Sequence, residues 1–188
     1  DDKVGDAIQP FLEDVFRTAK DVALAPNAAW YLWHAHLTSA FFAAAAAAAA
    51  DVLLHRQIIW VKPRFIIGFG AYHWSHESCF MGWVQGNKPP FYGERNQTTV
   101  WTIDYDGKKN PTDRIHPTQK PVALFEAPMV NHTKPGEIAF EPFLGSGSQI
   151  IAAEMLGRKC YALELDPGYC DVTVARWEKA TGKKATKA

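Results

Sequence analysis

The segment from residue 137 to residue 167 constrains the fold of this chain more than any other part of the sequence. It predicts an apolar strand, a turn containing Gly145 and Gly147, a helix, and a second strand that ends at Glu164. Glycine lets a backbone turn sharply and approach a ligand closely, and a helix that begins there presents free N–H groups. Strand, helix and strand in this order predict a βαβ unit with a parallel sheet.

The same segment indicates a nucleotide-binding site. Glu164 follows Gly145 by 19 residues, where a carboxylate can accept hydrogen bonds from ribose hydroxyls. This spacing does not separate NAD from S-adenosylmethionine, but Ile150 stands where a dinucleotide motif has its third glycine, which argues against a dinucleotide. The alternative is an ordinary βα turn in which the glycines serve packing and Glu164 is a solvated strand end.

The rest of the chain alternates between helical and strand patterns. We expect helices over 6–25, 37–50, 121–132, 148–157 and 167–180, and strands over 28–35, 57–62, 76–84, 98–103, 137–142 and 159–165. Pro63 is expected to stop the strand at 57–62. Residues 43–50 are eight alanines, which favour a helix but show no amphipathic pattern, so they carry no functional prediction.

Composition narrows the class of protein. The 188 residues, 47% of them hydrophobic, fit one compact domain. Net charge is zero, but residues 52–100 carry five basic and two acidic side chains, so an anionic partner is expected against the middle of the chain. Three irregularly spaced cysteines argue against a disulfide framework or zinc site and favour a reducing, cytoplasmic compartment. Outside the alanine tract no apolar run is long enough to span a membrane.

Three motifs in the second half resemble one family. HPTQKP at 116–121, EPFLGSGS at 141–148 and ELDPGYCDVTVARWE at 164–178 are similar to the β-group of DNA amino-methyltransferases. Members of this group form N6-methyladenine or N4-methylcytosine from S-adenosylmethionine. The resemblance implies an α/β fold: a Rossmann-like, doubly wound methyltransferase sheet with an antiparallel strand addition near 57–84, incomplete at its N-terminus. It also implies a single domain, 1–188, with the rest of the catalytic half at 1–84, a short target-recognition segment at 85–115 and the cofactor half at 116–188.

The resemblance implies a set of cofactor contacts. Thr118 and Lys120 would hold the methionine carboxylate of S-adenosylmethionine, although Thr118 is equally suited to cap the helix that begins at Pro121. Glu164 would bind the ribose, and Leu165 would lie against the adenine. The full set is His116, Thr118, Lys120, Glu141, Phe143, Gly145, Gly147, Ser148, Glu164 and Leu165. Glu141 and Ser148 replace the family's usual Asp and Thr, and because the carboxylate is kept we expect cofactor binding to survive.

The family's catalytic motif, (D/N/S)PP(Y/F/W), is absent from this chain. In the family its polar side chain and prolyl carbonyl accept hydrogen bonds from the target amine, and its aromatic ring stacks on the extruded base. The similar stretch KPPF at 88–91 begins with lysine and is interpreted as a Pro-rich loop. We therefore assign no catalytic residue, expect the motif to lie upstream of Asp1, and expect this chain alone to be inactive.

Double-stranded DNA is the partner that the resemblance implies, with adenine N6 favoured because it is the commoner target in the family. Lys62, Arg64, His73 and Arg95 are the predicted DNA contacts, among aromatic residues suited to stacking on bases; the alternative is solvated cations over a hydrophobic core. A homodimer and a partner restriction nuclease are compatible with the family. No metal site and no membrane association are expected. The alternative functions are a non-catalytic module that binds S-adenosylmethionine or DNA, and an enzyme that methylates RNA or a small molecule.

Overall fold

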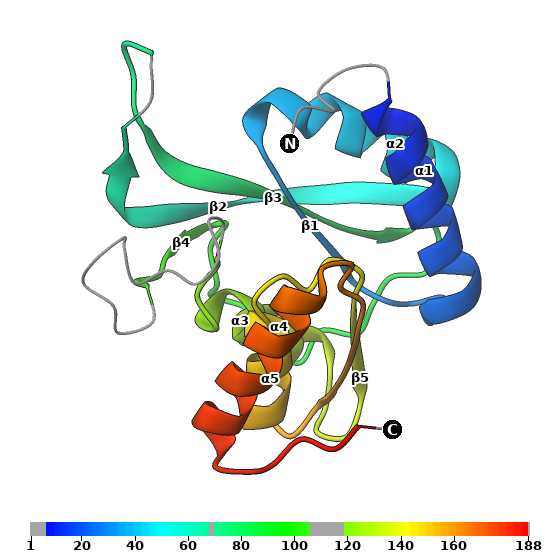
Figure 1. The fold of residues 1–188 in the computed structure, drawn as a ribbon. Helices are drawn as coiled ribbons and strands as arrows, with labels where there is room; N and C mark the ends of the chain where they lie inside the picture. Colours follow the sequence, from blue (N-terminus) through cyan, green and yellow to red (C-terminus); the bar gives the residue numbers. More distant parts are fainter. Residues whose placement is uncertain (1–6, 68–69, 106–118, 188) are drawn as a thin grey trace. The chain divides into compact units, whose positions relative to one another are not determined.

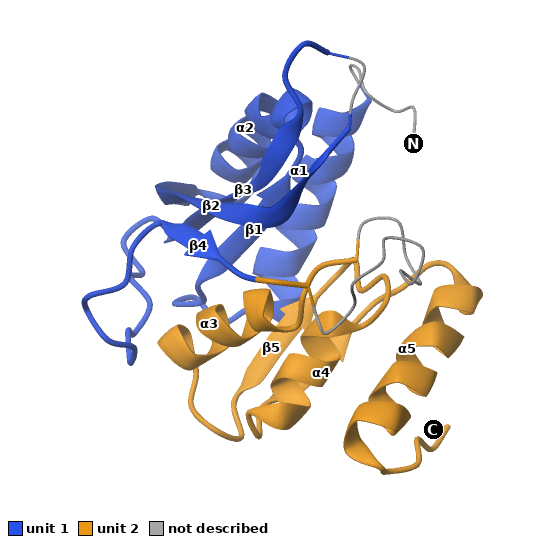
Figure 2. Ribbon diagram, turned by 90° about the vertical axis from the view of Figure 1, so that its left-hand side faces the viewer, with its two compact units in different colours: residues 1–103 blue, residues 104–188 orange. Residues whose placement is uncertain are grey.

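The structure is a computed structural model that describes residues 7–67, 70–105 and 119–187 (Figure 1). Contacts within the chain divide it into two compact units, residues 1–103 and 104–188 (Figure 2). Each unit is described by itself. The expected single domain with boundaries after residues 84 and 115 stays a prediction.

The described part of the chain alternates between helices and strands throughout. The first unit contains α1 (Ile8–Thr18), a π-helical turn (Ala19–Ala23), β1 (Trp30–His34), a 3-10 turn (His36–Thr38), α2 (Ser39–Ala50), β2 (Val52–Ile66), β3 (Trp74–Val84) and β4 (Val100–Thr102). The second contains α3 (Ala123–His132), β5 (Ile138–Glu141), α4 (Ser148–Met155), β6 (Lys159–Ala162) and α5 (Pro167–Thr181). Each expected helix and strand has a counterpart, with shifted ends, and the α/β class is confirmed.

The first unit is built on a four-stranded sheet with the order β1-β3-β2-β4. β3 pairs antiparallel with both β1 and β2, which confirms the expected antiparallel addition, and β4 pairs parallel to β2. α1 and α2 lie side by side against one face of this sheet (Figure 2). The ring of Phe16 on α1 meets Trp30 edge-on with centroids 5.8 Å apart, so an aromatic contact joins the helices to the sheet.

The sheet buries apolar side chains on its other face as well. Ile58, Cys79, Met81 and Trp83 form one buried cluster, with Tyr31 and Trp33 among the partly buried side chains packed against it. Successive side chains of a strand point to opposite faces. Trp30 therefore packs on the helix-covered face of the sheet and Tyr31 on the opposite face. Because both faces are apolar, the run at 28–35 does not alternate between apolar and polar residues.

The prediction that Pro63 ends its strand is wrong. β2 runs from Val52 to Ile66, and its pairing with β3 jumps from Val61↔His76 to Ile66↔Trp74. Pro63 lies in this irregular stretch, where its missing N–H removes no bond from the ladder with β3. The early start of β2 was missed because a second irregularity, between Leu54 and Arg56, interrupts the alternation at its beginning.

The second unit contains the expected parallel βαβ arrangement. β5 and β6 pair in register from Ile138↔Lys159 to Glu141↔Ala162, and α4 connects them. Met129 of α3 packs with Ala152 and Ala153 of α4 in a buried cluster. β6 ends at Ala162, two residues before Glu164. Beyond it, the N–H of Leu163 still donates to the carbonyl of Glu141, and its carbonyl accepts from the N–H of Leu144 in the loop after β5.

The alanine tract folds as the helix that its composition favours. Ala45, Ala46, Ala49 and Ala50 of α2 are buried, and α2 contacts α1, β1 and β2. The repeat of pairs four residues apart is the spacing of one helical face. Of the helices in the described residues, none combines the length and the apolar character needed to cross a bilayer.

The close approach of β3 to β2 generates a stability prediction. A Cβ atom on Gly82 would lie 2.3 Å from the carbonyl oxygen of Leu53, so a side chain there forces the backbones apart. We expect Gly82→Ala to lower the free energy of unfolding by about 3 kcal/mol, measured by urea denaturation. Gly70→Ala is the control: its Cβ would meet no atom closer than 3.7 Å and should leave stability nearly unchanged. Equal stability of both variants would contradict the packing described.

Candidate functional site

The glycine turn between β5 and α4 has the backbone conformation that glycine permits. Gly145 and Gly147 have φ angles of 56° and 81°, in the left-handed region. A Cβ atom on Gly147 would also lie 2.5 Å from Cγ2 of Thr173. Both conformation and space therefore require glycine at position 147, and α4 begins directly after it at Ser148.

The carboxylate of Glu164 holds this turn. Its Oε2 accepts a 2.6 Å hydrogen bond from the N–H of Gly145, and its Oε1 accepts one of 2.9 Å from the N–H of Asp166. Glu164 thus ties the turn after β5 to the loop after β6. Each carboxylate oxygen keeps a further lone pair, which can accept a hydrogen bond from a ribose hydroxyl. The expected contact with a ribose stays a prediction. Leu165 beside it is 98% exposed.

A cavity of about 100 Å³ lies over the turn. Its lining residues are Gln119, Lys120, Phe125, Glu141, Phe143, Leu144, Gly145, Ser146, Ser148 and Gln149. The structure therefore brings together Lys120, Glu141, Phe143, Gly145 and Ser148 from the set that the sequence predicts. Gly147, Glu164 and Leu165 do not line this cavity, and His116 and Thr118 lie outside the described residues.

The charged side chains of the cavity are held by the backbone around them. Oε1 of Glu141 accepts a 2.8 Å hydrogen bond from the N–H of Phe143. Removal from water raises the pKa of Glu141 to about 7, although this hydrogen bond and the charge of Lys120 both act to lower it. The hydroxyl of Ser148 donates to the carbonyl of Lys120 at 2.7 Å. The cavity thus offers one ammonium group, one carboxyl group that titrates near neutrality and the start of a helix, which suits a zwitterionic ligand.

Two residues that the sequence did not reveal support the turn from α5. Thr173 Oγ1 donates to the carbonyl of Gly145 at 3.1 Å, and the guanidinium of Arg176 donates to the hydroxyl oxygen of Ser146 at 3.0 Å. Thr173 follows Gly145 by 28 residues, and Arg176 follows Ser146 by 30. The only signal for them is their place in the motif at 164–178, which does not say what they contact.

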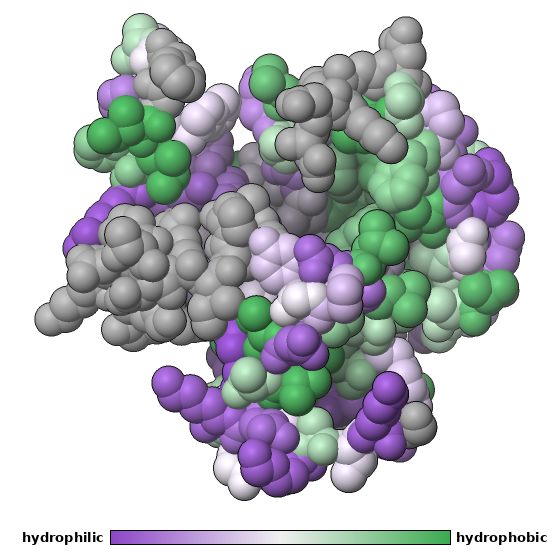
Figure 3. Space-filling model, in the orientation of Figure 1, coloured by the Kyte–Doolittle hydropathy of each residue, from purple (hydrophilic) through white to green (hydrophobic). Residues whose placement is uncertain are grey.

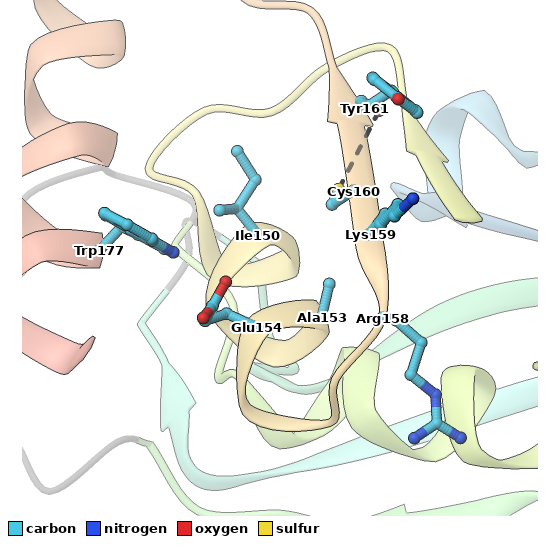
Figure 4. A pocket seen from close by; sticks show the side chains of 8 residues that line it. All are labelled: Ile150, Ala153, Glu154, Arg158, Lys159, Cys160, Tyr161 and Trp177. Carbon is cyan, nitrogen blue, oxygen red and sulfur yellow. Dashed lines mark hydrogen bonds between the residues drawn. The ribbon is translucent and has the colours of Figure 1, made fainter. Parts of the chain in front are cut away.

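A second, larger cavity of the same unit, about 360 Å³, lies beside α4, β6 and α5 (Figure 4). Two of its charged lining groups have partners elsewhere: Glu154 pairs with Lys183, and Arg158 donates to the carbonyls of Leu156 and Thr133. Burial raises the pKa of the Cys160 thiol to about 12, so it is not ionised at neutral pH. This cavity offers neither a thiolate nucleophile nor the converging polar groups of the cavity over the turn.

Comparison with known proteins identifies the family. The family model described as DNA methylase (N6_N4_Mtase) matches residues 4–175. The chain belongs to this DNA methylase family. The resemblance to DNA amino-methyltransferases that the motifs indicated is therefore confirmed.

Three relatives show how far the likeness extends. The type II methyltransferase M2.MboI of Moraxella bovis is 26% identical over 135 residues, 66% of this chain and 50% of the relative. The type II methyltransferase M.HinfI of Haemophilus influenzae is 27% identical over 193 residues, 93% of this chain and 53% of the relative. The crystal structure of the M1.HpyAVI-SAM complex matches with a TM-score of 0.73 at 23% identity, over 92% of this chain and 84% of that one. The chain spans about half the length of these curated relatives, and the structural match confirms the methyltransferase fold.

The DNA contacts predicted for this chain lie in different surroundings. Arg64 and His73 are exposed on the β2–β3 hairpin, where the ring of His73 stacks on Phe65 with centroids 5.3 Å apart. Arg95 is exposed in the loop before β4. Lys62 is only 10% exposed and pairs with Glu77 at 2.7 Å, so a phosphate would have to displace that carboxylate.

The hairpin also exposes apolar side chains. Phe65, Ile67 and Tyr72 are 58%, 80% and 92% exposed, and Figure 3 shows hydrophobic residues gathered over this end of β2 and β3. From residue 56 to residue 75 the sequence has no Asp or Glu. Exposed cations beside exposed aromatic rings are the surface expected of a nucleic-acid contact.

The histidines are placed in the sheet and its loops. His34 is buried and stacks on Phe80 with centroids 4.2 Å apart. Burial lowers its pKa, which keeps the ring neutral at pH 7. In the part of the chain that the structure describes, no three His, Cys, Asp or Glu side chains gather as metal ligands would.

The raised pKa of Glu141 predicts a pH-dependent stability. The folded protein keeps a proton on Glu141 up to about pH 7, whereas the unfolded chain loses it near 4.5. The contribution of this group is therefore fully present below pH 4.5 and is lost as the pH rises through 7. We expect Glu141→Gln to remove this loss, so that the variant gains stability relative to wild type between pH 5 and pH 8, measured as urea midpoints. Parallel pH profiles of the two proteins would show that Glu141 titrates normally.

Proposed function

We propose that this methylase uses S-adenosylmethionine to methylate an exocyclic amine of a DNA base, with adenine N6 favoured over cytosine N4. The observation that carries the proposal is the cavity over the glycine turn, which gathers Lys120, Glu141, Phe143, Gly145 and Ser148 in a chain of the DNA methylase family. The match to a methyltransferase crystallised with SAM supports the same cofactor here.

The cavity suits the amino-acid part of S-adenosylmethionine. The ammonium group of Lys120, with the hydroxyl of Thr118, would bind the carboxylate. Backbone atoms of Glu141, Phe143, Gly145 and Gly147 would surround the rest of the amino-acid part. Next to the turn, Glu164 would receive the ribose hydroxyls, and Leu165 and His116 complete the proposed set. The near-complete exposure of Leu165 leaves an apolar surface that a flat adenine would cover.

In the proposed reaction no residue of this chain forms a covalent bond to the substrate or the cofactor. When bound, S-adenosylmethionine supplies an electrophilic methyl group, which the electron pair of the amine takes as the carbon–sulfur bond breaks. The side chains described here bind and orient. No (D/N/S)PP(Y/F/W) tetrapeptide occurs in the sequence, so we propose that this chain alone does not polarise the target amine and is inactive without a segment that does.

The β2–β3 hairpin and the loop before β4 are the proposed DNA-binding surface. Arg64, His73 and Arg95 would contact phosphates of double-stranded DNA, and Lys62 would join them where its ion pair with Glu77 opens. Exposed rings such as Tyr72 would stack on unpaired or extruded bases. We further propose, from the type II names of the relatives, a partner restriction nuclease. We also propose a homodimer. The three free cysteines support a cytoplasmic location.

The cofactor proposal predicts the effect of removing Lys120. We expect Lys120→Ala to raise the dissociation constant for S-adenosylmethionine at least several-fold, because a carboxylate loses its charged partner. Isothermal titration calorimetry measures it. Lys184→Ala is the matched control, since Lys184 pairs with Glu178 on the surface and should not affect binding. Unchanged affinity in Lys120→Ala would refute the assigned role.

Methyl transfer tests the reaction itself. The protein in its longest natural form is incubated with tritium-labelled S-adenosylmethionine and, in parallel, with DNA or with RNA, and the nucleosides are then separated. We expect label in N6-methyladenine; label in N4-methylcytosine would correct the target base, and label only in RNA would overturn the DNA assignment. The missing tetrapeptide favours a second candidate, a non-catalytic module that binds S-adenosylmethionine or DNA. That candidate predicts binding with no label transferred at all.

A further inference from the structure

Two side chains on one face of α5 contact successive residues of the glycine turn. Thr173 and Arg176 are three residues apart, the spacing of helical neighbours. Thr173 donates to the carbonyl of Gly145 at 3.1 Å. Arg176 donates to both the carbonyl and the hydroxyl oxygen of Ser146 through the same nitrogen, Nη1. α5 therefore supplies the donors for two consecutive carbonyl groups of the turn.

The contacts of Arg176 continue toward the charged side of the cavity. Its Nη1 lies 3.4 Å from the hydroxyl oxygen of Ser148, and that hydroxyl donates to the carbonyl of Lys120 at 2.7 Å. Arg176, Ser148 and Lys120 thus form a series of contacts from α5 to the backbone that carries the Lys120 ammonium group. Arg176 does not line the cavity itself.

Burial makes these bonds important for the conformation of the turn. Ser146, Ser148 and Thr173 are only 5%, 4% and 5% exposed, so water does not replace a lost partner easily. Gly145 and Gly147 have the widest choice of backbone conformations of any residue type. Without donors from α5 the turn would leave carbonyl groups unsatisfied and would sample other conformations.

We propose that Arg176 is a positioning residue for the cofactor site: its guanidinium holds residues 145–148, and through Ser148 the backbone of Lys120, in the arrangement that receives S-adenosylmethionine. The inference rests on the proposed function, because the ligand is the one proposed above. Its action is indirect, since Arg176 contacts the turn and does not line the cavity. Loss of Arg176 should therefore weaken ligand binding more than it weakens the fold.

Arg158 provides a matched control in the same unit. Its guanidinium also makes three hydrogen bonds, to the carbonyl of Leu156 and to the carbonyl and hydroxyl of Thr133. None of these partners belongs to the turn or lines the cavity over it. Removal of either arginine costs hydrogen bonds, but only the removal of Arg176 should change the cofactor site.

The test compares wild type with Arg176→Met, Arg176→Lys and Arg158→Met in the full chain. Titration calorimetry measures the dissociation constant for S-adenosylmethionine, and thermal unfolding measures stability. We expect Arg176→Met to raise the dissociation constant about tenfold or more, because the turn loses a charge-assisted hydrogen bond. We expect Arg176→Lys to recover part of this affinity, and Arg158→Met to change it by less than about twofold even where it lowers the melting temperature.

Hydrogen–deuterium exchange without ligand gives a second readout. The peptide covering 141–150 should exchange faster in Arg176→Met than in wild type or Arg158→Met, because the turn opens more often. If Arg176→Met does not fold, Arg176→Lys carries both measurements. Wild-type affinity and exchange in the Arg176 variants, or equal losses in both arginine variants, would overturn the inference. A wild-type chain that does not bind S-adenosylmethionine would overturn the proposed function instead, while the exchange result would still show whether Arg176 holds the turn.

Discussion

The hydrogen bond from the N–H of Gly145 to the carboxylate of Glu164 is the interaction on which the second unit depends most. It joins the loops that follow two parallel strands, and the neighbouring oxygen of the same carboxylate accepts from Asp166. Asp166 in turn caps α5 by accepting from the N–H of Gly168 at 2.7 Å. The carboxylate of Glu164 is therefore linked through Asp166 to the start of α5, the helix that carries the two side chains supporting the turn.

The two acidic residues of the site have different chemistry because their surroundings differ. Glu164 receives two backbone N–H groups, which satisfy a carboxylate directly. Glu141 receives one and is removed from water, so burial outweighs the nearby ammonium of Lys120 and its proton is retained to about pH 7. The carboxyl group that lines the cavity is therefore neutral below about pH 7, while the oxygens of Glu164 accept the backbone N–H groups that hold the turn.

Local sequence patterns predicted the elements and the family of this chain, but not the side-chain contacts that complete the site. The strand–turn–helix order and the glycine positions depend on neighbouring residues, so they are readable directly. The ribose contact expected of Glu164 stays a prediction, and its bond to Gly145 depends on where β5 ends, which the pattern did not show. Arg176 was hidden for a related reason, because an arginine in an amphipathic helix reads as a surface residue until the fold brings it to Ser146. Lys62 read as a free cation because its partner Glu77 lies on the next strand.

The run of identical alanines in α2 leaves the position of this helix along its axis undetermined by its own middle residues. Identical methyl groups interlock equally well after a shift of one residue, so the middle of α2 cannot specify its alignment with α1. That information must come from the ends. At the start, Phe42 lies 6.1 Å from Phe16 and 5.9 Å from His34 between ring centroids. At the finish, Asp51 adopts a left-handed conformation and pairs with Lys20 at 2.7 Å. The contacts at the two ends of α2, and not its alanine side chains, therefore fix the position of this helix along its axis.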